Sequence, residues 1–252
     1  MLYQTGASGY SQKPMQRPLA LITGGARRVG RAIALHLAHQ GYDVAFTYLS
    51  SKAEALLLIA ELRNIGVEAL SMQVDLTDLP VGVEQISRHL GNSASRLKCL
   101  VNNASIYQPD SAIDSAASMY RIHAEAPLLL ARGLSPHLAA NHGCIINMCD
   151  ILGARPMPGW LAYCSSKAAL ANITMGLARE LAPDVRVCGI APGVAQWPDD
   201  YDESARKEYL RRVPLQRAGT PEEVARLAWF LLNDATYITG QIIPIDGGRS
   251  IV

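Results

Sequence analysis

The chain has 252 residues, of which 49% are hydrophobic and 18% are charged, which is enough for one domain with a sizeable core. The net charge is +1 and no long basic run occurs, so nothing indicates binding to nucleic acid or to an anionic membrane. No apolar stretch reaches about 18 residues, the length that a membrane-spanning helix requires. These properties favour a single globular domain with no membrane partner.

The first 18 residues, MLYQTGASGYSQKPMQRP, are polar and lack the apolar centre of a signal peptide. We interpret residues 1–18 as a flexible leader and residues 19–252 as the domain. The five cysteines form no CxxC pair and four of them lie in apolar segments. This pattern favours buried thiols, a reducing cytoplasmic location and no metal site.

Apolar runs alternate with amphipathic helical stretches along the whole chain. The expected strands are 19–23, 43–48, 67–74, 99–104, 144–149, 185–191 and 241–245. The expected helices are 31–41, 52–65, 80–90, 114–140, 161–182 and 221–233. This alternation predicts a single doubly wound α/β domain of the Rossmann type, with a seven-stranded parallel sheet and helices on both faces. The irregular segment 193–219 is rich in Pro, Asp and Arg and is interpreted as a substrate loop.

A glycine-containing turn joins the first strand to the first helix. The motif Thr23-Gly24-x-x-x-Arg28-x-Gly30 is a variant of TGxxxGxG with Arg28 at the middle glycine. Such turns hold a pyrophosphate on backbone N–H groups and on the positive end of the helix, although the motif alone is a weak signal. Arg27 and Arg28 form either a solvated helix start or phosphate contacts. We favour phosphate contacts, because cations without an anionic partner oppose the helix dipole.

The end of the second strand indicates which nucleotide is bound. An NAD site usually has an acidic residue about 20 residues after the glycine turn, where it binds the ribose 2′-hydroxyl. Here the strand ends at Tyr48, and Ser50 and Ser51 follow, which together with Arg27 suit a 2′-phosphate. We therefore predict NADP(H). Asp75, at the end of the third strand, either holds the adenine amino group or caps the next helix.

A possible catalytic pair opens the helix after the fifth strand. Tyr163 and Lys167 are four residues apart, so their side chains share one helical face at the ligand-binding edge of such a sheet. A nearby ammonium lowers the pKa of a tyrosine, which makes Tyr163 a candidate proton donor near neutral pH. Asp150 lies thirteen residues before Tyr163 at a strand end. It is interpreted either as part of the proton chemistry or as a loop-orienting carboxylate.

From LITGGARRVG to YITGQIIPIDGG the chain resembles the short-chain dehydrogenase/reductase family. VNNAS at 101–105 resembles the family's NNAG, APG at 191–193 its PG turn, and Tyr163/Lys167 its YxxxK motif. The resemblance implies an NADPH site. Its implied residues are Gly24, Arg27, Arg28, Val29, Tyr48, Ser50, Ser51, Asp75, Leu76, Asn103, Ala104, Ser105, Tyr163, Lys167, Pro192 and Gly193.

Three departures from the common pattern resemble the pteridine reductases and the similar bacterial dihydromonapterin reductases. Arg28 replaces a glycine, Ser105 follows NNA, and Asp150 stands where most relatives have serine. His123 takes the place of a helix asparagine that usually holds a water in a proton relay. It either replaces that asparagine or is a core histidine.

The resemblance implies reduction of a dihydropterin to a tetrahydropterin, with Asp150, Tyr163 and Lys167 catalytic. Arg28, Tyr107, Asp150, Tyr163 and Trp197 are the implied substrate contacts, with Tyr107 stacking the pterin. Trp197 either covers the substrate or packs within its loop. The family usually forms homotetramers through its long helices.

Two other functions are open. A reductase of a carbonyl compound, such as a 3-oxoacyl thioester or a sugar, uses the same fold, but Asp150 and Tyr107 speak against it. A nucleotide-binding sensor without catalysis is disfavoured by the intact Tyr163/Lys167 pair, although the missing asparagine keeps it open.

Overall fold

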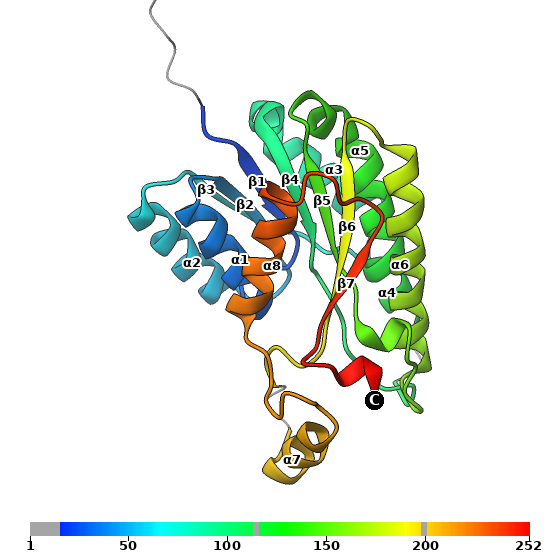
Figure 1. The fold of residues 1–252 in the computed structure, drawn as a ribbon. Helices are drawn as coiled ribbons and strands as arrows, with labels where there is room; N and C mark the ends of the chain where they lie inside the picture. Colours follow the sequence, from blue (N-terminus) through cyan, green and yellow to red (C-terminus); the bar gives the residue numbers. More distant parts are fainter. Residues whose placement is uncertain (1–15, 113–115, 198–200) are drawn as a thin grey trace, which may run out of the picture.

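The computed structural model describes residues 16–112, 116–197 and 201–252, which form one sheet covered by helices on both faces (Figure 1). The sheet in these residues has seven strands in the order β3-β2-β1-β4-β5-β6-β7, and every neighbouring pair is parallel. The strands are β1 Leu19–Ile22, β2 Asp43–Tyr48, β3 Ala69–Gln73, β4 Leu97–Asn102, β5 Cys144–Met148, β6 Arg186–Pro192 and β7 Ile242–Ile245. The predicted doubly wound α/β fold is confirmed.

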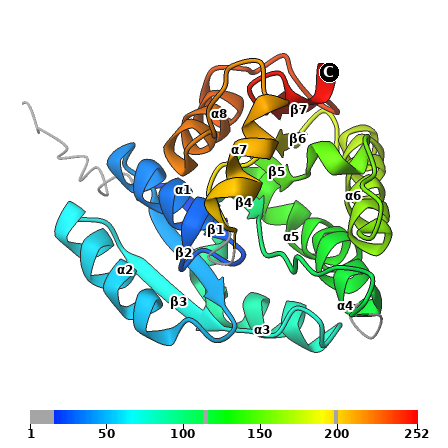
Figure 2. The same ribbon diagram turned by 90° about the horizontal axis from the view of Figure 1, so that it is seen from below.

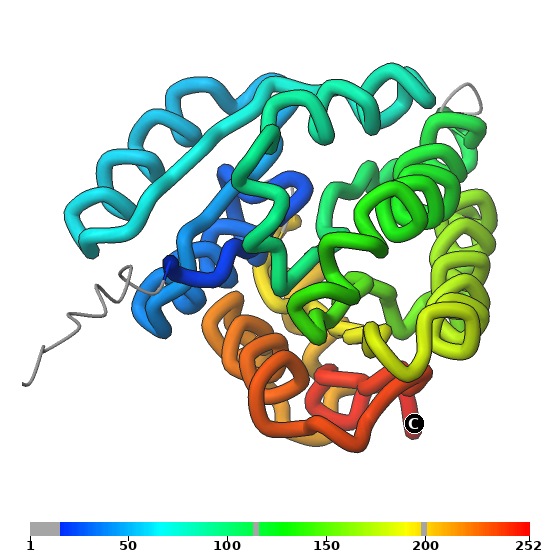
Figure 3. The backbone as a smooth tube through the Cα atoms, turned by 90° about the horizontal axis from the view of Figure 1, so that it is seen from above, coloured from blue at the N-terminus to red at the C-terminus, as the bar shows by residue number. Residues whose placement is uncertain are grey.

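Helices cover the two faces in separate groups, which Figures 2 and 3 show from opposite ends. One group is α1 Arg28–His39, α2 Lys52–Ile65 and α8 Pro221–Asn233. The other is α3 Val81–Leu90, α4 Ala116–Tyr120, α5 Ala126–Ala140 and α6 Leu161–Glu180. No helix in the described ranges has both the length and the apolar character needed to cross a membrane.

The central strands are continuous apolar runs because both of their faces are buried. In β1, Ile22 belongs to the core beneath α1 and α8, together with Ile33 and Leu231. Its neighbour Leu21 belongs to the opposite core, together with Leu130 of α5. Alternate side chains of one strand therefore stabilise both helical layers.

The chain reverses its winding direction between β3 and β4. Strand β1 lies in the middle, with β2 and then β3 on one side and β4 on the other. Because the strands are parallel, their carboxyl ends meet at one edge of the sheet. A crevice forms at such a reversal, and ligands of open α/β sheets bind there.

Two elements differ from the sequence-based expectation. The helix expected over 114–140 is divided into α4, a π-helical turn at Arg121–Glu125 and α5, and residues 113–115 lie outside the described residues. The segment 193–219 contains the helix α7 Glu203–Arg211, which apolar periodicity did not predict because this helix buries none of its residues.

The start of the domain is also earlier than expected. Residues 1–15 lie outside the described residues, so the predicted leader is untested over that range. The carbonyl of Pro18 accepts a hydrogen bond from the Asp43 N–H at 2.9 Å, and Arg96 donates to the carbonyl of Arg17 at 3.1 Å. Residues 17 and 18 are therefore hydrogen-bonded to the domain and are not part of a free leader.

Candidate active site

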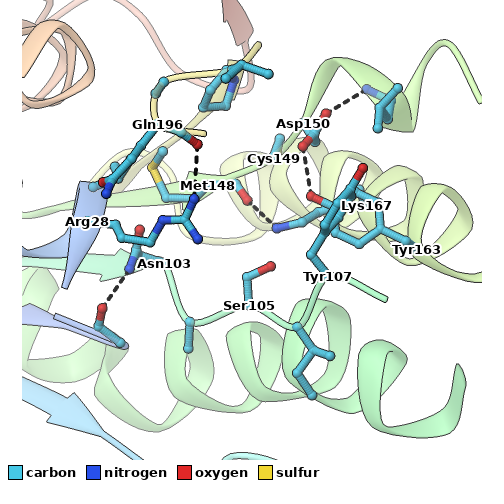
Figure 4. Close-up of a pocket in the computed structure, with 18 of the residues that line it drawn as sticks. Arg28, Asn103, Ser105, Tyr107, Met148, Cys149, Asp150, Tyr163, Lys167 and Gln196 are labelled. Atoms are coloured by element: carbon cyan, nitrogen blue, oxygen red, sulfur yellow. Dashed lines mark hydrogen bonds between the residues drawn. The ribbon is translucent and has the colours of Figure 1, made fainter. Parts of the chain in front are cut away.

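A cavity of about 1100 Å³ opens at the carboxyl edge of the sheet. The glycine turn, the segments that follow β2 to β6, the start of α6 and the inner side of α7 form its walls. Figure 4 shows side chains from these separate parts of the chain converging on one space. The cavity joins the predicted nucleotide-binding residues to the predicted catalytic residues.

The glycine turn lies against the end of β4 so closely that side chains are excluded. A Cβ on Gly24, whose φ is +63°, would lie 2.9 Å from the Cα of Ala104. A Cβ on Gly30 would lie 2.4 Å from the carbonyl oxygen of Gly24. The Asn103 amide donates to the carbonyls of Thr23 and Gly24, each at 3.0 Å. This bare backbone at a helix N-terminus fits a pyrophosphate.

Arg28 keeps the left-handed backbone conformation that a glycine would provide, with φ of 52°. Its Nη2 donates to the carbonyl oxygens of Gln196 at 3.0 Å and Trp197 at 3.1 Å, so its side chain bridges the glycine turn and the segment after β6 (Figure 4). The first turn of α1 contains no acidic residue. Its positive end is thus available to a ligand anion.

The predicted 2′-phosphate residues occupy different positions. Tyr48 lies in the cavity wall, while Ser50 and Ser51 precede α2 beyond the residues that line the cavity. Arg27 lines the cavity, and its Nε lies 3.8 Å from a carboxylate oxygen of Glu54. This acidic neighbour on α2 offsets part of the positive charge that the sequence analysis assigned to Arg27.

Asp75 does not cap the next helix, because α3 begins at Val81 with Pro80 at the N-cap position and no side-chain cap. Its Oδ1 accepts from the Thr77 N–H at 2.8 Å and from the Thr77 hydroxyl at 2.7 Å. Asp75 and Leu76 also line the cavity beside Val29. The carboxylate therefore orders the segment after β3, and its contact with adenine stays a prediction.

Tyr163 and Asp150 are in direct contact at the end of β5. The Tyr163 hydroxyl donates to Asp150 Oδ2 at 2.7 Å, and Asp150 Oδ1 accepts from the Leu152 N–H at 2.8 Å. Lys167 Nζ donates to the carbonyl of Met148 at 2.8 Å. One oxygen of Asp150 thus orients the loop and the other contacts the tyrosine, and its part in proton chemistry stays a prediction.

The electrostatic effect on Tyr163 is opposite to the prediction. Burial, followed by the neighbouring Asp150 carboxylate, raises the pKa of Tyr163 well above its usual value. Lys167 Nζ is 5.8 Å from the centroid of the tyrosine ring and does not outweigh these two causes. Burial also raises the pKa of Asp150 and lowers the pKa of Lys167. In each of the three groups, burial shifts the pKa in the direction that disfavours the charged form.

Aromatic side chains form one wall of the cavity. The Tyr107 ring stacks on Trp160, with centroids 4.0 Å apart and planes 17° from parallel. It meets the Tyr163 ring edge-on at 4.9 Å. Tyr107 therefore lies beside Tyr163, one of its faces already contacts Trp160, and its stacking on a pterin stays a prediction.

Trp197 packs within its loop, which is one of the two interpretations given above, and does not cover the cavity. Its ring packs against Tyr201 and Tyr209, with centroid distances of 5.7 Å and 5.4 Å, and against the Arg206 guanidinium at 5.8 Å. These contacts lie between the segment after β6 and α7. The Trp197 carbonyl accepts from Arg28, whereas its side chain lies outside the residues that line the cavity.

Comparison with known proteins decides the family. A family model described as Enoyl-(acyl carrier protein) reductase matches residues 24–250, which include the glycine turn and the Tyr163/Lys167 pair. The chain belongs to the short-chain dehydrogenase/reductase family. Its members bind NAD(P)H, and this chain is accordingly an oxidoreductase of that family.

Individual relatives of this oxidoreductase carry different names. It is 32% identical over 238 residues to a 3-oxoacyl acyl-carrier-protein reductase of Staphylococcus aureus, covering 91% of this chain and 96% of that relative. It is 34% identical over 283 residues to pteridine reductase 1 of Leishmania tarentolae, covering 93% and 96%. The crystal structure of acetoin dehydrogenase from Enterobacter cloacae has a TM-score of 0.84 and 27% identity, covering 94% and 97%.

The reductase cavity includes residues that the sequence analysis missed. Trp160, Arg155, Tyr209 and Arg249 all line it. Trp160 is the residue just before α6, which begins at Leu161. Tyr209 comes from α7, which apolar periodicity did not predict. Arg155 and Arg249 come from segments where no periodicity indicates which way a side chain points.

Proposed function

We propose that this reductase is an NADPH-dependent pteridine reductase that converts a dihydropterin to a tetrahydropterin. The observation that supports it most is the hydrogen bond of 2.7 Å between the Tyr163 hydroxyl and Asp150, beside an aromatic wall. Reduction of a C=N bond adds a hydride to carbon and a proton to nitrogen. The site therefore needs a proton source at a ring nitrogen rather than only a donor to a developing alkoxide.

Asp150 supplies chemistry that a serine at this position lacks. Burial raises the pKa of Asp150, which increases the fraction of neutral carboxylic acid at a given pH. A neutral carboxyl group both donates and accepts hydrogen bonds. In that form the carboxyl group would donate to the Tyr163 oxygen, the reverse of the hydrogen bond in the structure. Tyr163 would then give its own proton to the substrate nitrogen and take the Asp150 proton in its place.

The glycine turn, Arg27, Arg28 and the end of β4 would hold the nicotinamide nucleotide. The fit is supported by the side-chain-free approach of Gly24 and Gly30 to neighbouring backbone atoms and by the free positive end of α1. When bound, NADPH supplies the hydride. Lys167, fixed by the Met148 carbonyl at 2.8 Å, keeps a cation near the proton-donating pair.

A second candidate function is reduction of a 3-oxoacyl thioester, which the name of the Staphylococcus aureus relative favours. The Leishmania tarentolae relative favours the pteridine assignment. Asp150 and the stacked pair Tyr107/Trp160 distinguish the two, because a flat heteroaromatic ring gains from stacking and an acyl chain does not. A cytoplasmic location, which the cysteine pattern favours, and a homotetramer, which the resemblance implies, are part of the same proposal.

A substrate panel tests this proposal directly. The loss of NADPH absorbance is measured with oxidised pterins, with dihydropterins carrying monapterin, biopterin or folate side chains, and with acetoacetyl thioesters. Turnover of the dihydropterins at a kcat/KM well above that of the thioesters is the expected result. The reverse order would assign the second function.

We expect a preference for NADPH over NADH of at least about tenfold in kcat/KM, which is about 1.4 kcal/mol. The reason is that no acidic residue follows Tyr48, while Arg27 is nearby. Steady-state kinetics with both nucleotides measures the ratio, and equal efficiency would contradict it. Glu54→Gln should increase the preference, since Glu54 lies 3.8 Å from Arg27.

Tyr107→Ala should raise the KM for dihydropterin several-fold with little change in the NADPH dissociation constant. An aromatic contact contributes about 0.5–1.5 kcal/mol beyond burial, and the change removes the ring that contacts Trp160 and Tyr163. Tyr237→Ala is the matched control, because that side chain is fully exposed. An unchanged KM would place the substrate elsewhere.

A further inference from the structure

His123 lies beneath the cavity floor, in the π-helical turn Arg121–Glu125. Its side chain is buried, with 1% of its surface exposed, and its ring meets the Tyr163 ring edge-on at 5.5 Å. Both ring nitrogens have hydrogen-bond partners in the described residues. These partners determine which nitrogen carries the proton.

The backbone of the segment after β4 identifies the unprotonated nitrogen. The N–H of Ile106 donates to His123 Nε2 at 3.2 Å, so Nε2 is an acceptor. On the other side, Nδ1 lies 2.8 Å from the Ser166 hydroxyl oxygen. That hydroxyl donates its only proton to the carbonyl of Tyr163 at 2.7 Å. Ser166 therefore accepts from Nδ1–H, and His123 is the neutral Nδ1–H tautomer.

This tautomer fixes the direction of a second hydrogen bond, to Ser105. The Ser105 hydroxyl oxygen is 2.8 Å from His123 Nε2. Since Nε2 has no proton, the serine must donate, and only its oxygen lone pairs remain for other partners. Ser105 lines the cavity between Arg28 and Tyr107 (Figure 4). The serine thus presents an acceptor and no donor to a ligand.

The neutral state of His123 is stable over the physiological pH range. Burial, followed by the charge of Lys167, lowers the pKa of His123 to about 2. A protonated ring would make Nε2 a donor, which would oppose the Ile106 N–H that now donates to it at 3.2 Å and would reverse the hydrogen bond with Ser105.

We propose that His123 is a positioning residue that accepts the hydroxyl proton of Ser105 in a hydrogen bond. Ser105 can then only accept from a ligand, so the site selects ligands with an N–H or amino group at that point. A ligand with a carbonyl oxygen at that point meets lone pairs and is disfavoured. The ligand part of this inference rests on the proposed function, because pterins carry amino and ring N–H groups. The hydrogen-bond direction rests on this chain alone.

The same contacts decide between the two interpretations of His123. Both ring nitrogens are hydrogen-bonded to Ser105, Ile106 or Ser166. Neither nitrogen is therefore available to hold the relay water that the asparagine usually holds. Lys167 instead donates to the carbonyl of Met148. His123 acts through Ser105 rather than on the reacting atoms.

The tautomer is measured by long-range proton–nitrogen correlation spectra of uniformly ¹⁵N-labelled protein, from about pH 5 to about pH 9. We expect one histidine to stay neutral with its proton on Nδ1 and to be missing from the spectrum of His123→Asn. His89→Asn is the matched control, because that ring lies on the exposed face of α3. A His123 ring protonated at Nε2, or one that titrates in this range, would overturn the proposal.

Selectivity is measured by dissociation constants of 2,4-diaminopteridine and 2,4-dioxopteridine in the presence of NADPH. The wild type should prefer the diamino compound by about tenfold, the effect of about one hydrogen bond to a buried group. His123→Asn should reduce that preference to within about twofold. The double variant His123→Asn/Ser105→Ala should show the same preference as Ser105→Ala alone. Retention of the preference in His123→Asn, or a further loss in the double variant, would refute the positioning role.

The two measurements separate the failure of this inference from the failure of the proposed function. If neither pteridine binds the wild type, the pterin assignment is wrong, and the spectra still decide the direction of the Ser105 hydrogen bond. NADPH affinity and melting temperature of each variant check that it folds. If His123→Asn loses NADPH binding, Ser166→Ala is used in its place. This variant removes the acceptor of the Nδ1–H, so the tautomer is no longer fixed and the preference for the diamino compound should weaken.

Discussion

Tyr163→Phe is expected to lower the single-turnover rate of dihydropterin reduction by about 10² to 10⁴-fold, the contribution of a general acid. The substitution removes the hydroxyl that donates to Asp150 at 2.7 Å and leaves the ring against Tyr107 and His123. The NADPH dissociation constant should change little. Rapid mixing under single-turnover conditions, with a fluorescence titration of NADPH, measures both quantities.

The variant also leaves one oxygen of Asp150 without its partner, so some loss of stability is expected. Asp150 lines the cavity and is only partly buried, so the loss should be no more than the net contribution of one hydrogen bond, about 0.5–1.5 kcal/mol, and thermal unfolding of wild type and variant measures it. Tyr237→Phe, on the surface, is the control that should behave as wild type. Full turnover in the folded Tyr163→Phe variant would mean that another group delivers the proton.

Asp150→Asn is expected to lower kcat by at least about tenfold. The amide keeps the shape of the side chain and the acceptor for the Leu152 N–H. It can donate a hydrogen bond to Tyr163 but cannot release a proton to it. The comparison therefore separates the proton chemistry of Asp150 from its role in orienting the loop.

The pH profile gives a second readout for Asp150. Because its pKa is raised by burial, the fraction with a protonated carboxyl falls as the pH rises through that raised value. The apparent values belong jointly to Asp150, Tyr163 and Lys167. Asp150→Asn should shift or remove the limb that the carboxyl dominates, and Asp150→Ser should lower pterin turnover far more than NADPH affinity. A fully active, folded Asn variant would return Asp150 to a purely structural role.

The fold could be predicted because the same pattern, a buried apolar strand followed by an amphipathic helix, is repeated along the chain. Each central strand is buried on both faces, as Leu21 and Ile22 show, so each is an uninterrupted apolar run that a short window detects. Helix α7 has no such signal, since it buries none of its residues and depends on contacts such as Trp197 with Tyr209. Periodicity detects burial, and a helix at the surface of a cavity has little of it.

The candidate site was predicted where local motifs place residues on regular elements. Tyr163 and Asp150 follow from positions on α6 and at the end of β5, and the structure brings them into contact. The pKa of Tyr163 was predicted in the wrong direction, because a motif indicates the presence of Lys167 and not the burial around it. Burial depends on the whole fold, which no short motif contains.

Arg28 belongs to both halves of the cavity, and this connects the energetics of the two ligands. Its guanidinium binds the carbonyls of Gln196 and Trp197, while its backbone forms the turn that would receive a pyrophosphate. A nucleotide that draws the guanidinium toward its phosphates releases those carbonyls and changes the free energy of the segment leading to α7. Linkage is reciprocal, so a substrate that favours one arrangement of that segment changes nucleotide affinity by the same factor. A single side chain thus couples the two binding free energies, so that each ligand changes the affinity of the site for the other.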